Sequence, residues 1–353
     1  MNKKVWKAVF VAAVIMMKTC VLGIMTLFLF LVSCQDEKKG IERIGDISFS
    51  VVSDSIYSRM PGKIFYQNNI LFWHDAVSSE NIIHVLNVTT GDEISSFGNI
   101  GMGPKEFVRP MLSLSPKNGL YLNDLEKGLQ ALAHIENDSD SLRVHYQSFG
   151  KEELVTSLLH ISDDDVLYFK PDKSEPFELC VDGIKYQAGR WPIQEDIING
   201  FDVFQGALGY NSQNSCLVYS TYSFPYTAVY RLQNGKISLL KEMKTDIDYS
   251  VVQNELKLGK GNSKGLTELA LTKENIVMLQ RDIEVEGELP KPKSPRDIST
   301  LPRSLFVYDY DLNLKKIINM PFPLLRLCGD ANSDCVYAVA INPEYMIIKI
   351  DLK

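Results

Sequence analysis

The glycine-rich string at residues 97–110, FGNIGMGPKEFVRP, is the first candidate for chemistry, because loops of this composition can cradle a phosphate. A P-loop follows the pattern G-x-x-x-x-G-K-[ST], precedes a helix and keeps its backbone N–H groups free. Here a proline removes one N–H, no Lys-Ser/Thr pair follows the last glycine, and no helical or βαβ pattern surrounds the string. We therefore interpret it as a structural corner, built from Gly98, Gly101, Gly103, Pro104, Glu106 and Phe107.

Hydrolytic and metal-dependent chemistry also lack a complete residue set. The segment 261–265, GNSKG, matches the nucleophile elbow G-x-S-x-G, but that mechanism needs a later histidine and none follows His160. The five histidines form no HxH or HExxH pair. The aspartates at 163–165 lack the spaced ligands and the glycine of a calcium loop, so they predict a turn. We predict no catalytic residue, no metal and no cofactor.

The elements that would position any site are strands. Past residue 45, short runs rich in Val, Ile, Leu, Tyr and Phe are punctuated by Asn, Asp, Gly and Ser, which is typical of an all-β fold. A four-strand unit recurs, and its third strand returns at intervals of roughly 45 residues, the spacing of propeller blades. The six third strands read NIIHVLNV, LQALAHIE, FELCVDG, TAVYRLQ, SLFVYDYD and YMIIKIDL. We predict a six-bladed β-propeller over residues 46–353.

The two ends of this domain predict how the ring closes. The sixth unit stops after its third strand, at Lys353, and therefore lacks an outer strand. Residues 46–53, DISFSVVS, read as a strand that has no blade of its own. We expect this N-terminal strand to complete the last blade, because a closed ring removes an exposed sheet edge.

A binding site is most simply expected on one face of such a ring. The proline-rich insertion 281–304 falls between the second and third strands of the fifth unit and is predicted to be mobile. Loops of that kind project from the same face as the blade-to-blade connections, which include the glycine corner. Side chains near this face could bind a ligand or act on one, or they could simply pack the blades. The candidates are Trp73, His74, Asn123, Asp124, Phe224 and Tyr226.

Cysteine usage leaves two alternatives open at one hairpin. Cys328 and Cys335 flank the turn-rich segment GDANSD, and such neighbours could form a disulfide in an oxidising compartment. The alternative is a pair of buried free thiols. No CxxC spacing or neighbouring histidine indicates a metal site.

The N-terminus carries a targeting signal. A basic start and apolar runs end at LVSC, after which the chain turns polar with QDEKK. The LVSC motif resembles a bacterial lipobox, which implies that residues 1–34 are a signal peptide cleaved before an acylated Cys34. Residues 35–45 would then be a flexible tether. An uncleaved membrane anchor is the alternative.

These features together resemble the TolB-like and NHL-like six-bladed propeller lipoproteins of Bacteroidetes, a largely uncharacterised group. The resemblance rests on F-G-x-x-G-x-G-P-x-E-F-x-x-P, the lipobox and the repeat count, and it implies a fold and a location in the cell envelope, at the outer membrane. The net charge of −7 and the absence of a basic stripe exclude nucleic acid as a partner. We expect a lipid-anchored module that binds a protein, peptide or glycan. The alternative is a propeller enzyme of lyase, lactonase or hydrolase type, with a metal or polar site in the central channel.

Overall fold

The structure is a computed structural model that describes residues 41–45, 47–54, 56–115, 119–136, 141–294 and 297–353. The predicted signal peptide, Cys34 and the first part of the predicted tether lie outside the described residues. The chain divides into two units, Met1–Ile41 and Glu42–Lys353, and the second unit contains every described strand and helix. Among the described residues, no helix has the length and apolar character needed to cross a membrane.

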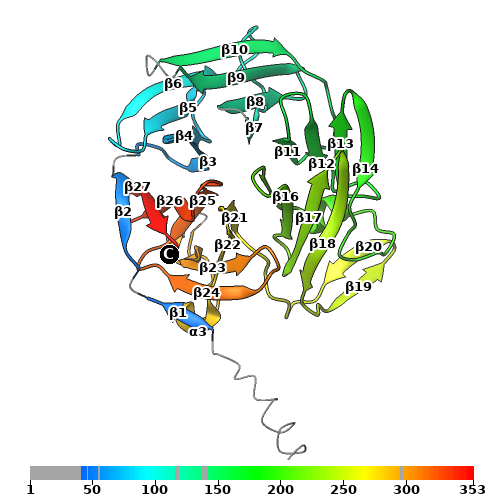
Figure 1. The fold of residues 1–353 in the computed structure, drawn as a ribbon. Coiled ribbons are helices and arrows are strands. Elements are labelled where there is room, and N and C mark those ends of the chain that lie inside the picture. Colours follow the sequence, from blue (N-terminus) through cyan, green and yellow to red (C-terminus); the bar gives the residue numbers. More distant parts are fainter. Residues whose placement is uncertain (1–40, 46, 55, 116–118, 137–140, 295–296) are drawn as a thin grey trace, which may run out of the picture. The chain divides into compact units, whose positions relative to one another are not determined.

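The second unit is a six-bladed β-propeller, as the repeat predicted (Figure 1). Each blade is an antiparallel sheet whose strands follow one another from the central channel outward. Blade 1 contains β3 (Pro61–Gln67), β4 (Ile70–Asp75), β5 (Glu80–Asn87) and β6 (Glu93–Asn99). Blade 2 contains β7 (Met111–Leu114), β8 (Leu120–Asp124), β9 (Leu129–Ile135) and β10 (Leu142–Ser148). Blade 3 contains β11 (Ser157–His160), β12 (Val166–Phe169), β13 (Phe177–Val181) and β14 (Ile184–Ala188).

The remaining blades follow the same plan. Blade 4 contains β15 (Gly206–Asn211), β16 (Cys216–Thr221), β17 (Tyr226–Gln233) and β18 (Lys236–Lys244). Blade 5 contains β21 (Glu268–Leu271), β22 (Asn275–Gln280), β23 (Ser304–Asp309) and β24 (Leu314–Asn319). Blade 6 contains β25 (Leu324–Gly329), β26 (Cys335–Ile341) and β27 (Tyr345–Asp351), and its outer strand is β2 (Phe49–Ser53).

Burial changes systematically across each blade. The second strands β8, β12, β16 and β26 are buried at every position, because both of their faces pack against neighbouring blades. Outer strands such as β14 are largely exposed. This explains why the second strands read as continuous apolar runs, VLYF and CVYAVAI for example, without the alternation of a half-exposed strand.

The N-terminal strand closes the ring, as predicted. β2 pairs antiparallel with β27, with Phe49 opposite Ile350 and Val51 opposite Ile348. Phe49 also packs edge-on against Phe322 at a ring-centroid distance of 5.1 Å. The C-terminal strand therefore has a partner on both sides, which removes a free edge.

A short strand before β2 adds to blade 5. β1 (Glu42–Ile44), which belongs to the predicted tether, runs parallel to β24. Arg43 also pairs with Asp282 at 3.1 Å and with Glu284 at 2.8 Å. The end of the tether is thus held by backbone pairing and by two carboxylates of the insertion.

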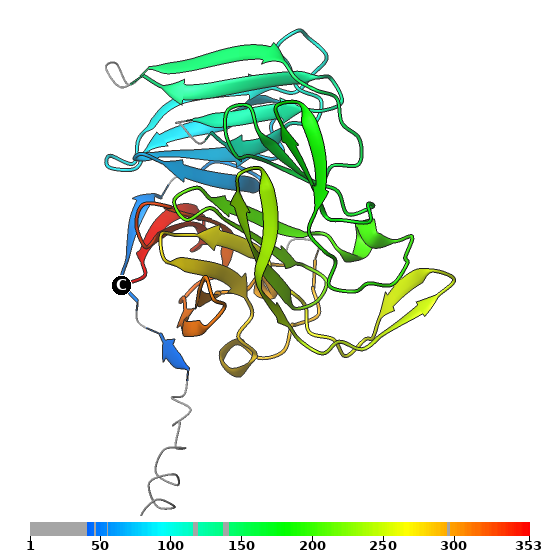
Figure 2. The same ribbon diagram turned by 45° about the vertical axis from the view of Figure 1, so that its right-hand side comes forward.

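The chain direction defines a loop face, on which the second-to-third-strand loops and the blade-to-blade connections lie. The glycine corner and the insertion 281–304 both belong to it. Short helices α2 (Gly200–Val203), α3 (Ile283–Glu286) and η1 (Ile298–Thr300) also occur in these connections. Between blades 4 and 5, a hairpin of β19 (Tyr249–Val252) and β20 (Glu255–Leu258) stands out from the ring (Figure 2).

Candidate functional site

The glycine corner is occupied by a carboxylate of its own. Glu106 accepts a hydrogen bond from the Gly103 N–H at 2.6 Å. A Cβ atom at Gly101 or Gly103 would come within 2.2 or 2.9 Å of this carboxylate, so a larger residue at either position would displace Glu106 from the corner. Phe107 is fully buried in the core shared by blades 1 and 2. The Glu106 carboxylate therefore occupies the place that a bound phosphate would take in the loop. Pro104 lies in the turn between Gly103 and Glu106.

Gly98 and Asp124 complete this corner. Gly98 has a φ of +82°, which favours glycine. The Asp124 carboxylate is fully buried and accepts from the N–H groups of Val108 at 2.5 Å and Arg109 at 3.3 Å. Its other oxygen accepts from the backbone N–H groups of residues 126 and 127, at 3.1 and 2.9 Å. Asp124 was a sequence candidate for ligand binding, but its carboxylate already accepts hydrogen bonds from four backbone N–H groups.

Asn123 joins a buried polar chain between blades 2 and 3. Its Oδ1 accepts from Gln130 at 2.7 Å and lies 3.1 Å from Nε2 of His160. The His160 ring lies 3.9 Å from the Tyr121 ring, and its Nδ1 has no hydrogen-bond partner within the described part of the chain. Burial lowers the pKa of His160 to about 4, so the imidazole is neutral. Asn123 is fully buried, so its side chain is not open to a ligand at the loop face.

The aromatic candidates pack the blades. Trp73 is 3% exposed and stacks on His84 at 4.0 Å. Phe224 and Tyr226 belong to the core between blades 3 and 4, where the Tyr226 hydroxyl donates to Glu242 at 3.2 Å. None of the three aromatic rings is available to stack on a ligand.

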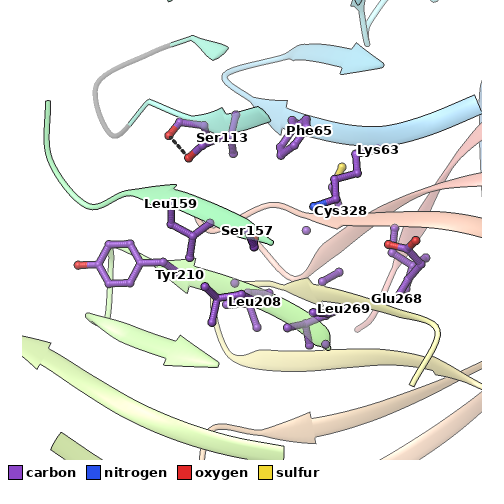
Figure 3. Close-up of a pocket in the computed structure, with 18 of the residues that line it drawn as sticks. Lys63, Phe65, Ser113, Ser157, Leu159, Leu208, Tyr210, Glu268, Leu269 and Cys328 are labelled. Carbon is purple, nitrogen blue, oxygen red and sulfur yellow. Dashed lines mark hydrogen bonds between the residues drawn. The ribbon is translucent and has the colours of Figure 1, made fainter. Parts of the chain in front are cut away.

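The central channel is a cavity whose lining includes none of these candidate residues. The inner strands of all six blades line a cavity of about 350 Å³ (Figure 3). Inner strands follow the blade-to-blade connections, so they begin at the loop face. Figure 3 shows Lys63 and Glu268 at one end of the cavity and Tyr210 and Ser113 at the other. Early positions of β3 and β21 place the charged pair at the loop-face mouth.

Three charged side chains from three different blades meet at this mouth. Arg326, the third residue of β25, donates from Nη1 to Oε1 of Glu268 at 2.8 Å. Lys63 makes no hydrogen bond or ion pair with the described residues. It lies close enough to Glu268 and Arg326 for their charges to act on its ammonium group. His74, at the end of β4, feels the positive charges of both Arg326 and Lys63. Of the sequence candidates, His74 alone lies close to the charged mouth.

The surrounding protein shifts the pKa values of these groups toward their neutral forms. Partial desolvation lowers the pKa of the Lys63 ammonium group, an effect that Glu268 opposes and Arg326 reinforces, although the side chain itself is exposed at the mouth. Burial likewise raises the pKa of Glu268 against the pull of Arg326 and Lys63. Burial lowers the pKa of His74. Burial raises the pKa of Tyr222, which lines the same mouth, to about 12, so its hydroxyl stays protonated.

One sequence signal for this cluster is a charged residue within a mostly apolar inner strand, which is not part of any motif. Lys63 and Glu268 occupy inner strands, PGKIFYQ and ELAL, whose other residues are mostly apolar. A charge inside such a strand is costly unless it is paired or solvated. Because the residues are more than 200 positions apart in the chain, spacing could not bring them together.

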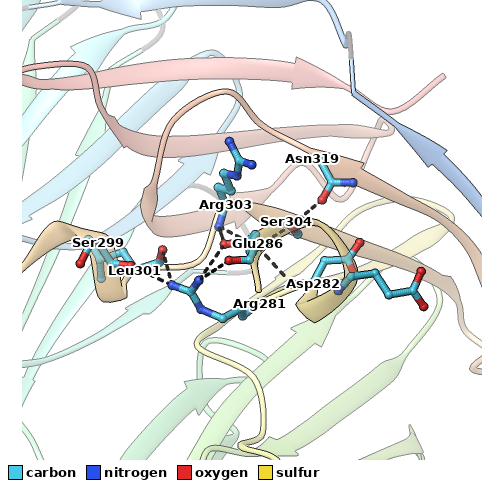
Figure 4. A network of polar contacts seen from close by, with 9 residues as sticks. Arg281, Asp282, Glu286, Ser299, Leu301, Arg303, Ser304 and Asn319 are labelled. Atoms are coloured by element: carbon cyan, nitrogen blue, oxygen red, sulfur yellow. Dashed lines mark hydrogen bonds and ion pairs between the residues drawn. The ribbon is translucent and has the colours of Figure 1, made fainter. Parts of the chain in front are cut away.

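The two ends of the insertion are braced by hydrogen bonds, and its mobility stays a prediction. Glu286 accepts from the Ser304 hydroxyl at 2.5 Å and from the Arg303 N–H at 3.2 Å (Figure 4). Arg281 donates to the Ser299 carbonyl at 2.9 Å, which ties the two ends of the insertion together. The proline count correctly excluded a strand but did not reveal these internal partners.

The possible disulfide is not formed, and no metal cluster exists in the described part of the chain. Cys328 and Cys335 are both buried free thiols. Cys328 lies opposite Tyr337, and Cys335 lies beyond the last paired position of β25, so the two are not direct cross-strand neighbours. The described residues contain no group of three or more His, Cys, Asp or Glu side chains that could hold a metal ion.

Comparison with known proteins found distant structural likeness and no sequence match. No family model and no curated protein matches the chain. A Myceliophteria thermophila Cps50 (Swd1) β-propeller domain shares 8% identity at a TM-score of 0.45, covering 86% of this chain and 99% of that one. U3-55K shares 11% identity at a TM-score of 0.49, covering 89% and 100%. A protein of Bacteroides fragilis NCTC 9343 described as exported shares 11% identity at 0.49, covering 88% and 99%. At these values the likeness says nothing of ligand or activity, and the six-bladed assignment rests on the strand pairing.

Proposed function

We propose that this chain is a cell-envelope lipoprotein of the TolB-like or NHL-like propeller type that binds a protein, peptide or glycan on its loop face. The observation that carries the proposal is the meeting of Lys63, Glu268 and Arg326 at the channel mouth. Closing a ring of blades requires no such group, and Lys63 is exposed while Arg326 and Glu268 are 23% and 20% exposed, so all three side chains can reach a ligand. An unpaired lysine beside an arginine is better explained by a ligand than by packing.

The loop face is also preorganised around this mouth. The corner is fixed by Glu106 and Asp124, and the insertion is fixed by Glu286 and Arg281. Binding to loops that are already ordered loses less conformational entropy. The lipobox motif supports an acyl group on Cys34 and an envelope location, which would place this face near ligands outside the cytoplasm.

Calorimetric titration tests the binding function. The probes are short peptides and cello-, xylo- and chito-oligosaccharides, titrated into the wild type, Lys63→Met and Lys273→Met. Lys273 is an exposed lysine between β21 and β22, on the face opposite to the loop face. We expect a probe whose binding is lost in K63M and kept in K273M. Binding that is lost only in K273M would place the ligand on the wrong face and reject the proposal.

A second candidate function is an enzyme with a polar site at the same mouth. The observation in its favour is the neighbouring pair of Glu268 and Lys63, whose pKa values are shifted toward their neutral forms. A carboxyl group and an amine of this kind can exchange protons with a substrate. Turnover of a chromogenic lactone or glycoside that disappears in Glu268→Gln would support it, and equal rates would reject it.

A further inference from the structure

The channel mouth contains more hydrogen-bond donors than acceptors. Lys63 has no hydrogen bond or ion pair among the described residues, and the Tyr222 hydroxyl, a hydrogen-bond donor, lines the same cavity. The Nε–H of Arg326 is buried and has no hydrogen-bond partner among the described residues. The charged acceptor here is Glu268, which Arg326 already uses. The mouth therefore carries surplus positive charge and unused donors, which a carboxylate would satisfy.

Deeper positions in the same cavity have the opposite character. Below the mouth the wall is formed mainly by apolar or small residues of the inner strands, among them Phe65, Leu159, Leu208, Ala270 and Leu327. Figure 3 shows Phe65, Leu159 and Leu208 around this part of the channel. Apolar walls favour an apolar ligand body, at roughly 25 cal/mol per Å² removed from water. A cavity of about 350 Å³ lies at the small end of ligand sites, which span roughly 300–1,000 Å³.

We propose that the central channel binds a small monocarboxylate with an apolar body, whose carboxylate lies between Lys63 and Tyr222 and whose apolar part enters the channel. This deepens the proposed function by naming the ligand chemistry of the channel mouth, and it rests on that mouth being a binding site. The carboxylate would supply the counter-charge that Lys63 lacks.

Octanoate is the probe, and its uncharged and cationic analogues are the ligand controls. Titration of octanoate into the wild-type protein is expected to show saturable binding with a stoichiometry of one. Octan-1-ol should bind at least about tenfold more weakly, and octylamine weaker still, because Lys63 and Arg326 repel a cation. Equal binding of octylamine and octanoate would overturn the charge argument.

Two variants separate the head-group site from the apolar channel. Lys63→Met removes the ammonium group, so octanoate should lose at least about tenfold in affinity while octan-1-ol changes little. Ser157→Leu, in the channel wall, should block both probes by filling the cavity. K273M serves as the folded control with unchanged affinity, and thermal unfolding of each variant verifies that it folds. Octanoate binding that survives both K63M and S157L would place the ligand elsewhere and refute the proposal.

Failure of this inference is distinguishable from failure of the proposed function. If octanoate does not bind but a peptide or oligosaccharide binds in a Lys63-dependent manner, the loop-face function stands and the monocarboxylate proposal is wrong. If octanoate binds through Lys63 and no peptide or oligosaccharide does, the channel site stands and the macromolecular ligand is wrong. If no probe binds, both are rejected.

Discussion

Replacing Asp124 decides whether this residue holds the fold or a ligand. Its carboxylate is fully buried and accepts four backbone hydrogen bonds, two on each oxygen. Asp124→Asn keeps the shape but turns one oxygen into an amide that cannot accept. Two N–H donors then lose their partner, and each such bond to a charged group contributes about 1.5–3 kcal/mol. Because neighbouring bonds are not additive, we expect a loss of about 3 kcal/mol in the free energy of unfolding.

Chemical denaturation with urea measures this loss directly. For a domain of this size, about 2 °C of melting temperature corresponds to each kcal/mol, so thermal unfolding should shift by about 6 °C. Asp202→Asn is the matched control, because Asp202 is exposed and its carboxylate makes no hydrogen bond with the described residues. Its free energy of unfolding should change by less than about 0.5 kcal/mol.

One outcome would refute the reasoning. If D124N unfolds at the same urea concentration as the wild type, the four contacts do not stabilise the corner. If it also loses binding of a peptide, an oligosaccharide or octanoate, Asp124 would be a ligand residue, as the sequence alone had allowed.

Three further predictions concern the supports of the loop face and the closure of the ring. Burial raises the pKa of Glu178, but hydrogen bonds and charges of Lys170 and Lys185 outweigh this and hold the pKa below its usual value. The ion pairs of Glu178 therefore stabilise the fold fully above about pH 5, and this contribution to the free energy of unfolding is lost as the pH falls through the lowered pKa. Lys170→Met should therefore cost about 3–5 kcal/mol at pH 7 and less at pH 3, measured by urea unfolding at both pH values; equal costs would contradict the linkage. Glu286→Gln should increase amide hydrogen exchange within the insertion, whereas Glu284→Gln, at a 72% exposed side chain, should not; unchanged exchange in both would show that the brace is unimportant. A chain beginning at residue 55 lacks β2 and should aggregate or melt at a lower temperature than one beginning at residue 41, as checked by light scattering and calorimetry; equal behaviour would argue against closure by β2.

The sequence alone determined the architecture of the propeller. Apolar runs of strand length, recurring at the spacing of one blade, can be satisfied only by stacked four-stranded sheets, and the missing outer strand of the last unit had one candidate donor. These are local or periodic signals, which a chain displays without folding. The glycine corner was interpretable for the same reason. Glu106 lies at most five residues from Gly101 and Gly103, the glycines that it packs against.

Tertiary structure decided which side chains are free to bind. Four candidates at sequence positions suited to a ligand face are not free to bind. Blade packing buries the side chains of Trp73, Phe224 and Tyr226, and the carboxylate of Asp124 is bound to backbone N–H groups. The channel mouth could not be read from spacing, because its groups come from blades 1, 5 and 6. Only closure of the ring brings Lys63 close to Glu268 and Arg326, because these residues belong to blades 1, 5 and 6.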